Sequence, residues 1–116
     1  MTRRIPEARR TPRFKLEVNI AVYPRNSQVI LGRTVDLSES GISAILKDEV
    51  SVGEMVRLEF DLAFGDVEVL AMVRHKTAFR YGFQFVDAGS AEVPIRRACQ
   101  ALAINQSIPT GPEAEG

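Results

Sequence analysis

Arginine side chains gather at the start of the chain, in the stretch RRTPRF just before the first strand-like run. Arg9, Arg10 and Arg13 each carry five N–H donors on a planar guanidinium, which binds phosphate and carboxylate groups through paired hydrogen bonds. The cluster therefore has the chemistry to hold an anion. Solvated arginines near a terminus more often serve solubility, so a second group of residues is needed to indicate a site.

A second polar stretch, DLSESG at 36–41, has the composition of a tight turn that a ligand can approach closely. Gly41 has no side chain to shield the backbone amides, and Ser38 is small. Asp36 supplies two oxygens that accept hydrogen bonds. Because Asp, Ser and Gly are also the usual residues of hairpin turns, this stretch alone is a weak signal.

Strand periodicity brings these two stretches together. From Phe14 onward, apolar residues alternate with mostly polar ones, which predicts a half-buried strand, and PRNS at 24–27 has turn chemistry. A hairpin centred on this turn pairs Phe14 with Leu37 and sets Arg13 opposite Ser38. The same register puts both apolar sets on one face through three further pairs, Leu16 with Val35, Ile20 with Leu31 and Val22 with Val29.

Arginine forks beside a carboxylate match a guanine nucleotide better than a bare phosphate. Guanine presents O6 and N7 as acceptors on one edge, where a guanidinium fits, and N1–H and N2–H as donors on another, where the carboxylate of Asp36 fits. Guanidinium planes can also stack on a purine face. We therefore expect a site for a guanine nucleotide between the arginines and the turn at 36–41.

Four more short strands complete the predicted sheet. GISAILK at 41–47 is one strand, and RYGFQF at 80–85 is the last. In the last strand the core-facing residues are Tyr81, Phe83 and Phe85. A hairpin centred on Phe64-Gly65 joins the other two strands and aligns their apolar sets as Leu62 with Val67, Phe60 with Val69, Leu58 with Ala71 and Val56 with Val73. Six antiparallel strands with regular turns predict a closed or partly closed barrel.

The C-terminal part of the chain changes to a helical period. Over residues 90–106, apolar side chains recur at i, i+3, i+4 and i+7, at Ile95, Ala98, Cys99 and Leu102. We expect one amphipathic helix over the barrel, so the fold class is mainly β with a single C-terminal α-helix. The predicted organisation is a flexible N-terminal arm at 1–8, the barrel plus helix at 9–106 and a disordered tail at 107–116.

Composition excludes several classes of function. At 116 residues the chain has room for one domain, and its apolar runs are too short to span a bilayer. Fifteen basic and fifteen acidic residues balance, but residues 1–33 carry eight basic and two acidic side chains, a net +6. This distribution favours a local anion site over a surface that coats a nucleic acid polymer. The lone thiol, Cys99, suits a reducing compartment, so we expect a cytoplasmic protein.

The remaining polar residues do not form a catalytic or metal-binding set. His75 is the single histidine, and no Cys, Asp or Glu stands at ligand spacing to it, so we expect no metal and no enzymatic activity. With Arg74, Lys76 and Arg80, it forms a second basic group that we interpret as a solvated hairpin. Arg33 interrupts the inward apolar set of its strand, either as an extra ligand contact or as the partner of an acid, and we favour the structural role.

The motif positions resemble those of a known family. The RxxxR spacing from Arg9 to Arg13 and the DxSxxG stretch at 36–41 are similar to the two-part signature of PilZ domains. YGFQF at 81–85 resembles the glycine-and-aromatic last strand of that family. The likeness covers roughly residues 8–103, and both halves of the signature occur in order at the family's strand spacing.

This resemblance implies a non-catalytic barrel that binds the bacterial second messenger cyclic di-GMP. By this likeness the arginines grip guanine and phosphate as the N-terminal arm folds over the ligand, and the turn residues hold the other guanine and the backbone. The implied ligand-binding residues are Arg9, Arg10, Arg13, Asp36, Ser38 and Gly41. In this family an arginine just before RxxxR favours binding of a stacked pair of ligands. Here Ala8 occupies that position, which favours one ligand per protomer.

The first interpretation is therefore a receptor that passes the signal to an unidentified protein effector. The second is a ligand-independent adaptor that binds a protein partner constitutively. The intact signature disfavours the adaptor. A small barrel that binds single-stranded nucleic acid is the third possibility, and the zero net charge and the core-like spacing of the aromatic residues disfavour it.

Overall fold

The computed structural model describes residues 12–63 and 65–107. The expected N-terminal arm at 1–8, the site residues Arg9 and Arg10, and residues 108–116 of the expected tail lie outside these residues. Ser107, the first residue of the expected tail, is the last residue of the helix. In chain order the elements are β1 (Phe14–Lys15), β2 (Asn19–Pro24), β3 (Ile30–Leu37), β4 (Gly41–Leu46), β5 (Met55–Leu62), β6 (Gly65–Thr77), β7 (Arg80–Asp87), the 3-10 turn η1 (Gly89–Ala91) and the helix α2 (Glu92–Ser107).

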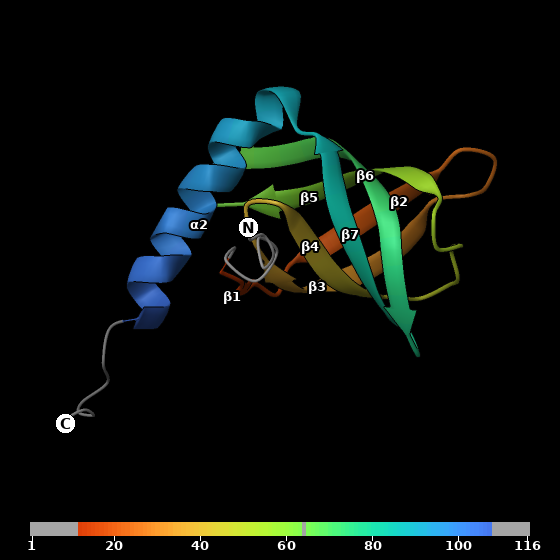
Figure 1. The fold of residues 1–116 in the computed structure, drawn as a ribbon, viewed down its shortest axis with the longest axis horizontal. Helices are drawn as coiled ribbons and strands as arrows, with labels where there is room; N and C mark the ends of the chain where they lie inside the picture. The colour runs from red at the N-terminus through yellow and green to blue at the C-terminus, as the bar shows by residue number, and fades with distance from the viewer. Residues whose placement is uncertain (1–11, 64, 108–116) are drawn as a thin grey trace, which may run out of the picture.

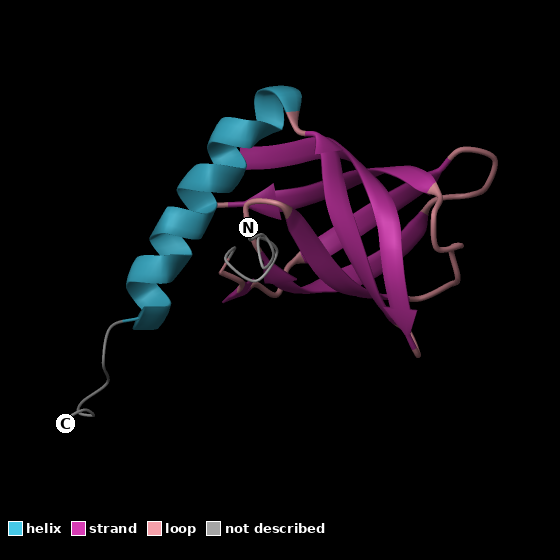
Figure 2. Ribbon diagram, in the orientation of Figure 1, coloured by secondary structure: helices cyan, strands magenta, loops and turns pink. Residues whose placement is uncertain are grey.

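Six antiparallel strands close into a barrel, as the sequence predicts, and one helix lies against it (Figures 1 and 2). The order around the barrel is β3, β2, β5, β6, β7 and β4, and β4 pairs with β3 to close the ring. The two-residue β1 is an additional strand that pairs with the end of β3. Closure pairs each of the six strands on both sides, so the barrel exposes no long sheet edge.

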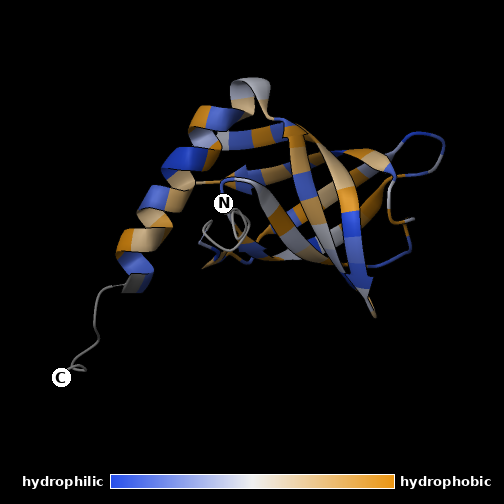
Figure 3. Ribbon diagram, viewed as in Figure 1, coloured by the Kyte–Doolittle hydropathy of each residue, from blue (hydrophilic) through white to orange (hydrophobic). Residues whose placement is uncertain are grey.

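Apolar side chains from alternate strand positions fill the barrel. Hydrophobic and hydrophilic residues alternate along the strands (Figure 3). Along β7, Tyr81 and Phe83 are buried and Phe85 packs partly buried on the same core, which confirms their predicted face. The buried sets of β5 and β6 are Val56, Leu58, Phe60, Leu62, Val67, Val69, Ala71 and Val73.

The hairpin between β5 and β6 has the predicted faces but a different register. Its pairs are Leu62 with Gly65, Phe60 with Val67, Leu58 with Val69 and Val56 with Ala71. Each predicted partner, Val67, Val69, Ala71 and Val73, is therefore wrong by two positions. The physical reason is a connection of two residues where the sequence suggested four. Because the side-chain period of a strand is two, this shift leaves the inward set unchanged.

The predicted first strand is broken into β1 and β2 by a β-bulge. On one side of the break the N–H of Leu16 donates to the carbonyl of Val35 at 3.1 Å, and on the other the N–H of Thr34 donates to the carbonyl of Val18 at 2.8 Å. Two residues on one strand thus face one on the other, and Glu17 is the extra residue. The Thr34 hydroxyl bridges the break, because it donates to the Leu16 carbonyl and accepts from the Val18 N–H.

The bulge makes the predicted register of the first hairpin right at one end and wrong at the other. Phe14 pairs with Leu37, as expected. Beyond the bulge the pairs are shifted by one residue, to Ile20 with Gly32 and Val22 with Ile30. The predicted partners Leu31 and Val29 are consequently 54% and 46% exposed, because a shift of one residue turns a side chain to the opposite face.

Arg33 has a structural role at this bulge. Its guanidinium donates to Oδ1 of Asn19 and to the backbone carbonyl of Glu17, each at 3.1 Å. The side chain therefore points away from the core and satisfies the backbone of the extra residue. Its partners are an amide oxygen and a carbonyl, not the acid that the sequence suggested.

A second β-bulge, at Val35 in β3, turns Asp36 outward. From Thr34 to Asp36 the chain advances two residues, while its partners in β4 advance by one. Regular alternation would put Asp36 on the same inward face as Thr34, which is 2% exposed. With the bulge, the next buried residue is Leu37, and the carboxylate of Asp36 lies outside the barrel.

The helix α2 covers one side of the barrel (Figure 1). Its bounds lie within two residues of those predicted, and its inner face carries the predicted set Ile95, Ala98, Cys99 and Leu102. Near its end, the N–H of Lys15 donates to Oε1 of Gln106 at 3.0 Å, and Nε2 of Gln106 donates to the carbonyl of Lys15 at 2.8 Å. The helix thereby holds β1, close to Arg13.

Candidate functional site

One row of paired residues crosses four neighbouring strands at the candidate site. Asp36 in β3 pairs with Ser43 in β4, which in turn pairs with Gly82 in β7. Gly82 pairs with His75 in β6. Residues that pair across an antiparallel sheet share a face, so the bulge that turns Asp36 outward brings its carboxylate into line with the other three.

Three side chains hold the carboxylate of Asp36. Arg13 donates to Oδ1 from Nε at 3.0 Å and from Nη2 at 2.7 Å. The hydroxyl of Ser43 donates to the same oxygen at 2.8 Å, and Nη2 of Arg80 donates to Oδ2 at 3.1 Å. The Asp36 side chain is 17% exposed, but those of Arg13 and Arg80 are 44% and 52% exposed. Both guanidiniums are therefore accessible to a ligand.

These contacts set the charge of Asp36. Burial acts to raise its pKa, but hydrogen bonds from Arg13 and Ser43, together with the positive charges of Arg13 and Arg80, outweigh burial and hold the pKa below its ordinary value. Asp36 is therefore ionised at neutral pH. The network carries one negative and two positive charges, which leaves a net positive charge for an anionic ligand.

A pocket of about 370 Å³ opens at this network, here called the arginine pocket. It is lined by Arg13, Asp36, Ser43, His75, Lys76, Thr77, Arg80, Tyr81 and Gly82. Three of these side chains are cationic and one is anionic. Nη2 of Arg13 and Nη2 of Arg80 lie 2.7 Å and 3.1 Å from the carboxylate of Asp36. Nζ of Lys76 instead lies 3.7 Å from Oε2 of Glu49. The balance of charge suits an anion.

The predicted turn at 38–41 forms beside Asp36 but does not line the arginine pocket. Ser38 is fully buried, and its hydroxyl accepts from the N–H groups of Ser40 and Gly41 at 3.2 Å and 3.1 Å. Gly41 lies so close to β7 that a Cβ there would be 2.3 Å from the carbonyl oxygen of Phe83. Ser38 and Gly41 therefore build the bend and its close approach to β7.

Two of the predicted site residues, Arg13 and Asp36, line the arginine pocket. Ser38 and Gly41 lie in the bend beside it. Arg9 and Arg10 lie outside the described residues. The structure thus brings together one member of each half of the sequence signature, Arg13 and Asp36.

Arg80 is a site residue that sequence reasoning missed. The end of β6 is hydrophilic, as Figure 3 shows, but Arg80 at the start of β7 is bound to Asp36 and is not simply solvated, which corrects our interpretation of this basic group. The pairing of Ser43 with Gly82 and of Ile45 with Arg80 brings this end of β7 beside Asp36. Finding it required the register of β4 against β7, which joins residues far apart in the sequence.

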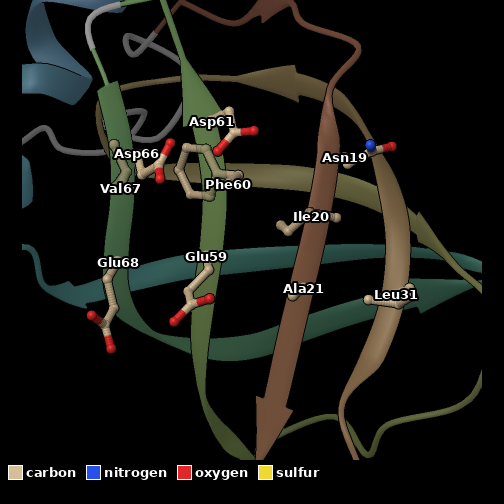
Figure 4. Close-up of a pocket in the computed structure, with 10 residues that line it drawn as sticks. All are labelled: Asn19, Ile20, Ala21, Leu31, Glu59, Phe60, Asp61, Asp66, Val67 and Glu68. Atoms are coloured by element: carbon tan, nitrogen blue, oxygen red, sulfur yellow. The ribbon is translucent and has the colours of Figure 1, made fainter.

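A second pocket, of about 470 Å³, is larger but has the wrong charge for an anion (Figure 4). This acidic pocket is lined by four carboxylates of β5 and β6, Glu59, Asp61, Asp66 and Glu68. Arg57 pairs with Glu59 and Glu68. Asp61 and Asp66 face each other across the strands, and the hydrogen bond and charge of Asp66 raise the pKa of Asp61. The arginine pocket is therefore the candidate site.

Three further features bear on function. Within residues 12–63 and 65–107, no three His, Cys, Asp or Glu side chains are grouped so that they could hold a metal ion. Over the same part of the chain, no helix has the length and apolar character needed to cross a membrane. Burial, with a smaller contribution from the charge of Glu39, raises the pKa of Cys99 to about 11, so its thiol is a poor nucleophile at neutral pH.

Comparison with known proteins gives a family and a fold. The sequence model of the PilZ domain family matches residues 7–102. The PilZ domain of YcgR from Escherichia coli, solved with c-di-GMP, is 17% identical with a TM-score of 0.71 over 86% of this chain and 95% of that chain. The PilZ domain of CeSA from a cellulose-synthesizing bacterium is 20% identical with a TM-score of 0.65, over 78% and 97%.

The complex of K. pneumonia MrkH with c-di-GMP is 17% identical with a TM-score of 0.72, and the match covers 95% of this chain and 56% of that one. No curated protein matches the chain. The solved structures share the fold at low sequence identity, which makes them evidence for the fold alone.

Proposed function

We propose that this chain, which belongs to the PilZ domain family, is a receptor for cyclic di-GMP. We further propose that the ligand binds in the arginine pocket. The observation that carries the proposal is the contact between the two halves of the sequence signature. Arg13, from the RxxxR motif, lies 2.7 Å from Asp36, from the DxSxxG motif. Solved PilZ proteins of the same fold, YcgR and MrkH, hold this dinucleotide.

The guanidiniums grip the ligand with the donors that Asp36 leaves unused. Asp36 accepts from Nε and Nη2 of Arg13 and from Nη2 of Arg80, which leaves Nη1 of both side chains for phosphate or for the O6 and N7 edge of guanine. The carboxylate thus fixes the orientation of two forks before the ligand arrives. Fixing them in advance lowers the entropy lost on binding.

Asp36 also reads guanine directly. Its Oδ1 already accepts three hydrogen bonds, two from Arg13 and one from Ser43, whereas Oδ2 accepts one, from Arg80. Oδ2 is therefore the acceptor for an N–H of the base. Ser38 and Gly41 build the bend beside the pocket, and its backbone contacts the part of the ligand that extends beyond the pocket lining. Arg9 and Arg10 complete the grip as the N-terminal arm folds over the ligand.

The receptor acts by binding alone and releases its ligand unchanged. A dianionic ligand neutralises the arginine-rich arm, so the arm docks when the site is occupied and creates a surface for a protein effector. We propose one ligand per protomer, because Ala8 precedes the RxxxR motif. A location in the cytoplasm stays a prediction from the lone cysteine.

Calorimetric titration with cyclic di-GMP, GTP and a short single-stranded oligonucleotide tests the proposal. The wild type should bind cyclic di-GMP selectively, with one ligand per protomer. Arg13→Ala should lose about 1.5–3 kcal/mol, or about ten- to a hundredfold in affinity, because a charge-assisted contact disappears. Arg96→Ala removes the same charge from the exposed surface of α2 and is the matched control. Absence of selective binding by the wild type leaves the ligand-independent adaptor as the better interpretation.

Asp36→Ala tests the role of the carboxylate in the same assay. Its loss should weaken binding of cyclic di-GMP more than binding of inorganic pyrophosphate, since pyrophosphate has no base to read. An equal loss for both ligands would show that Asp36 acts only through the arginines.

A further inference from the structure

The side chain of His75 lies across the neighbouring strand, in space that Gly82 leaves empty. The two residues pair between β6 and β7. A Cβ on Gly82 would be 2.2 Å from Cδ2 and 2.4 Å from Nε2 of the imidazole, closer than atoms can pack. The ring therefore occupies the place that any other side chain at position 82 would fill.

This imidazole lines the arginine pocket together with Arg13, Asp36 and Arg80. Its side chain is exposed, and within the part of the chain that the structure describes it has no hydrogen-bond or ion-pair partner. Because the ring folds back over β7, it lies about two strand spacings, or roughly 10 Å, from β3, the strand that carries Asp36. That separation is more than a phosphate group spans, so one ligand that reaches both must be larger.

We propose that His75 contacts the ligand and that its imidazole stacks on a guanine face of cyclic di-GMP; this inference rests on the proposed function. The guanidiniums and the carboxylate of Asp36 supply donors and acceptors for base edges and phosphates. Aromatic planes add a contact with the face of a base, whatever its edge pattern. A ring supported by β7 and open to the pocket provides that contact, and the absence of a side chain at Gly82 makes room for it.

Calorimetric titration of three His75 variants with cyclic di-GMP tests the stacking. His75→Ala removes the plane and should weaken binding by about 5- to 100-fold. His75→Phe keeps the plane and should bind nearly as well as the wild type, whereas His75→Lys keeps only a positive charge and should bind as weakly as His75→Ala. Rescue by lysine and not by phenylalanine would overturn the proposal in favour of a phosphate contact. Leu70→Ala, on the same strand and outside the pocket, is the control.

Gly82→Ala tests the support beneath the ring. The nearest atoms to the new Cβ all belong to His75, so the substitution displaces the ring without a clash against the backbone of the barrel. Gly82→Ala should therefore weaken binding about as much as His75→Ala, and the double variant should be no weaker than His75→Ala alone. Losses that simply add would contradict a shared mechanism.

A fluorescence experiment tests contact between the ring position and the base. The chain contains no tryptophan, so His75→Trp introduces a single fluorophore. Stacked guanine should quench it when cyclic di-GMP saturates the site. Phe79→Trp, on the exposed hairpin outside the pocket lining, is the control and should change little. An equal response at both positions, or none at position 75, overturns the inference.

The wild type and Arg13→Ala separate failure of this inference from failure of the proposed function. If the wild type binds, Arg13→Ala does not, and every His75 variant binds like the wild type, the receptor function stands and the role of His75 is wrong. If the wild type does not bind cyclic di-GMP, both fall together.

Discussion

Arg13 places two nitrogen atoms on one oxygen of Asp36, with Nε at 3.0 Å and Nη2 at 2.7 Å from Oδ1. The other oxygen, Oδ2, binds Arg80 at 3.1 Å. Each carboxylate oxygen is thus assigned to a different arginine, one from the segment before β1 and one from the start of β7. A single side chain therefore orients two guanidiniums that lie far apart in the sequence, and the bulge at Val35 is what puts it between them.

Arg80 should contribute to affinity although it lies outside both signature motifs. Arg80→Ala removes one of the two guanidiniums at the pocket and should weaken binding of cyclic di-GMP by about ten- to a hundredfold, or about 1.5–3 kcal/mol. Arg80→Lys keeps the charge but not the fork, so its affinity should lie between the two. Titration calorimetry measures both, and wild-type affinity in Arg80→Ala would limit the site to Arg13 and the N-terminal arm.

Acid should weaken the Asp36 network within a defined pH range. The folded protein holds the pKa of Asp36 below its ordinary value, so the stability that the carboxylate contributes is present above the unfolded pKa of about 3.9 and is lost as the pH falls through the folded pKa. Asp36→Asn should melt below the wild type at pH 7, and the gap should begin to narrow below about pH 4 and close as the pH falls through the folded pKa. Thermal melts across pH 3–7 measure this, and a gap independent of pH would contradict it.

Gly41 should be more sensitive to substitution than Gly82. Gly41→Ala puts a Cβ 2.3 Å from the carbonyl oxygen of Phe83, and that backbone atom is held in the sheet. We expect Gly41→Ala to lower the free energy of unfolding by about 1–3 kcal/mol, or more if β7 cannot shift. In Gly82→Ala the obstacle is only the ring of His75, which can move, so the loss should be smaller. Urea unfolding of both variants checks the order, and a reversed order would contradict this argument.

The parts of the fold that could be predicted depend on local signals. Period-two alternation and turn chemistry give the barrel strands and the pairing of Phe14 with Leu37, and the change to a helical period gives the helix. That pairing is what brings Arg13 to Asp36. The arginine motif and the turn motif therefore indicate a shared site before any long-range contact is known.

The parts that could not be predicted depend on extra residues and long-range register. Nothing in the composition of β3 marks Val35 as the extra residue, yet its bulge decides whether Asp36 faces the core or the solvent. Arg80 and His75 reach the pocket only because β7 pairs with β4 on one side and β6 on the other. The pairing of β4 with β7 joins segments that no turn connects, and the pairing of His75 with Gly82 depends on a register shift between Val73 and His75. Period and turn chemistry specify neither.

Removing one carboxylate from the acidic pocket should stabilise the protein. Asp61 and Asp66 pair across β5 and β6, and the contact with Asp66 raises the pKa of Asp61. A raised carboxyl pKa means that the charged form is disfavoured in the folded state, so the penalty is present at neutral pH and vanishes below the unfolded pKa of about 3.9. Asp61→Asn should melt above the wild type at pH 7 and level with it near pH 3. A lower melting temperature at pH 7 would show that the pair is held together by something else.

The link between α2 and β1 should affect the site through Lys15. Both backbone groups of Lys15 bond to the side chain of Gln106, and Arg13 lies two residues earlier in the chain. Gln106→Ala should free the Lys15 amide and raise its hydrogen-exchange rate, measured by NMR. The amide of Leu16 is an internal control, because it donates to the carbonyl of Val35 and not to the helix.

Since a looser β1 holds Arg13 less firmly, affinity for cyclic di-GMP should fall by a few-fold, consistent with about 1 kcal/mol for lost hydrogen bonds. Gln106→Glu keeps the acceptor for the Lys15 amide but loses the donor, so its effect should be smaller, and unchanged exchange at Lys15 in Gln106→Ala would rule out the coupling.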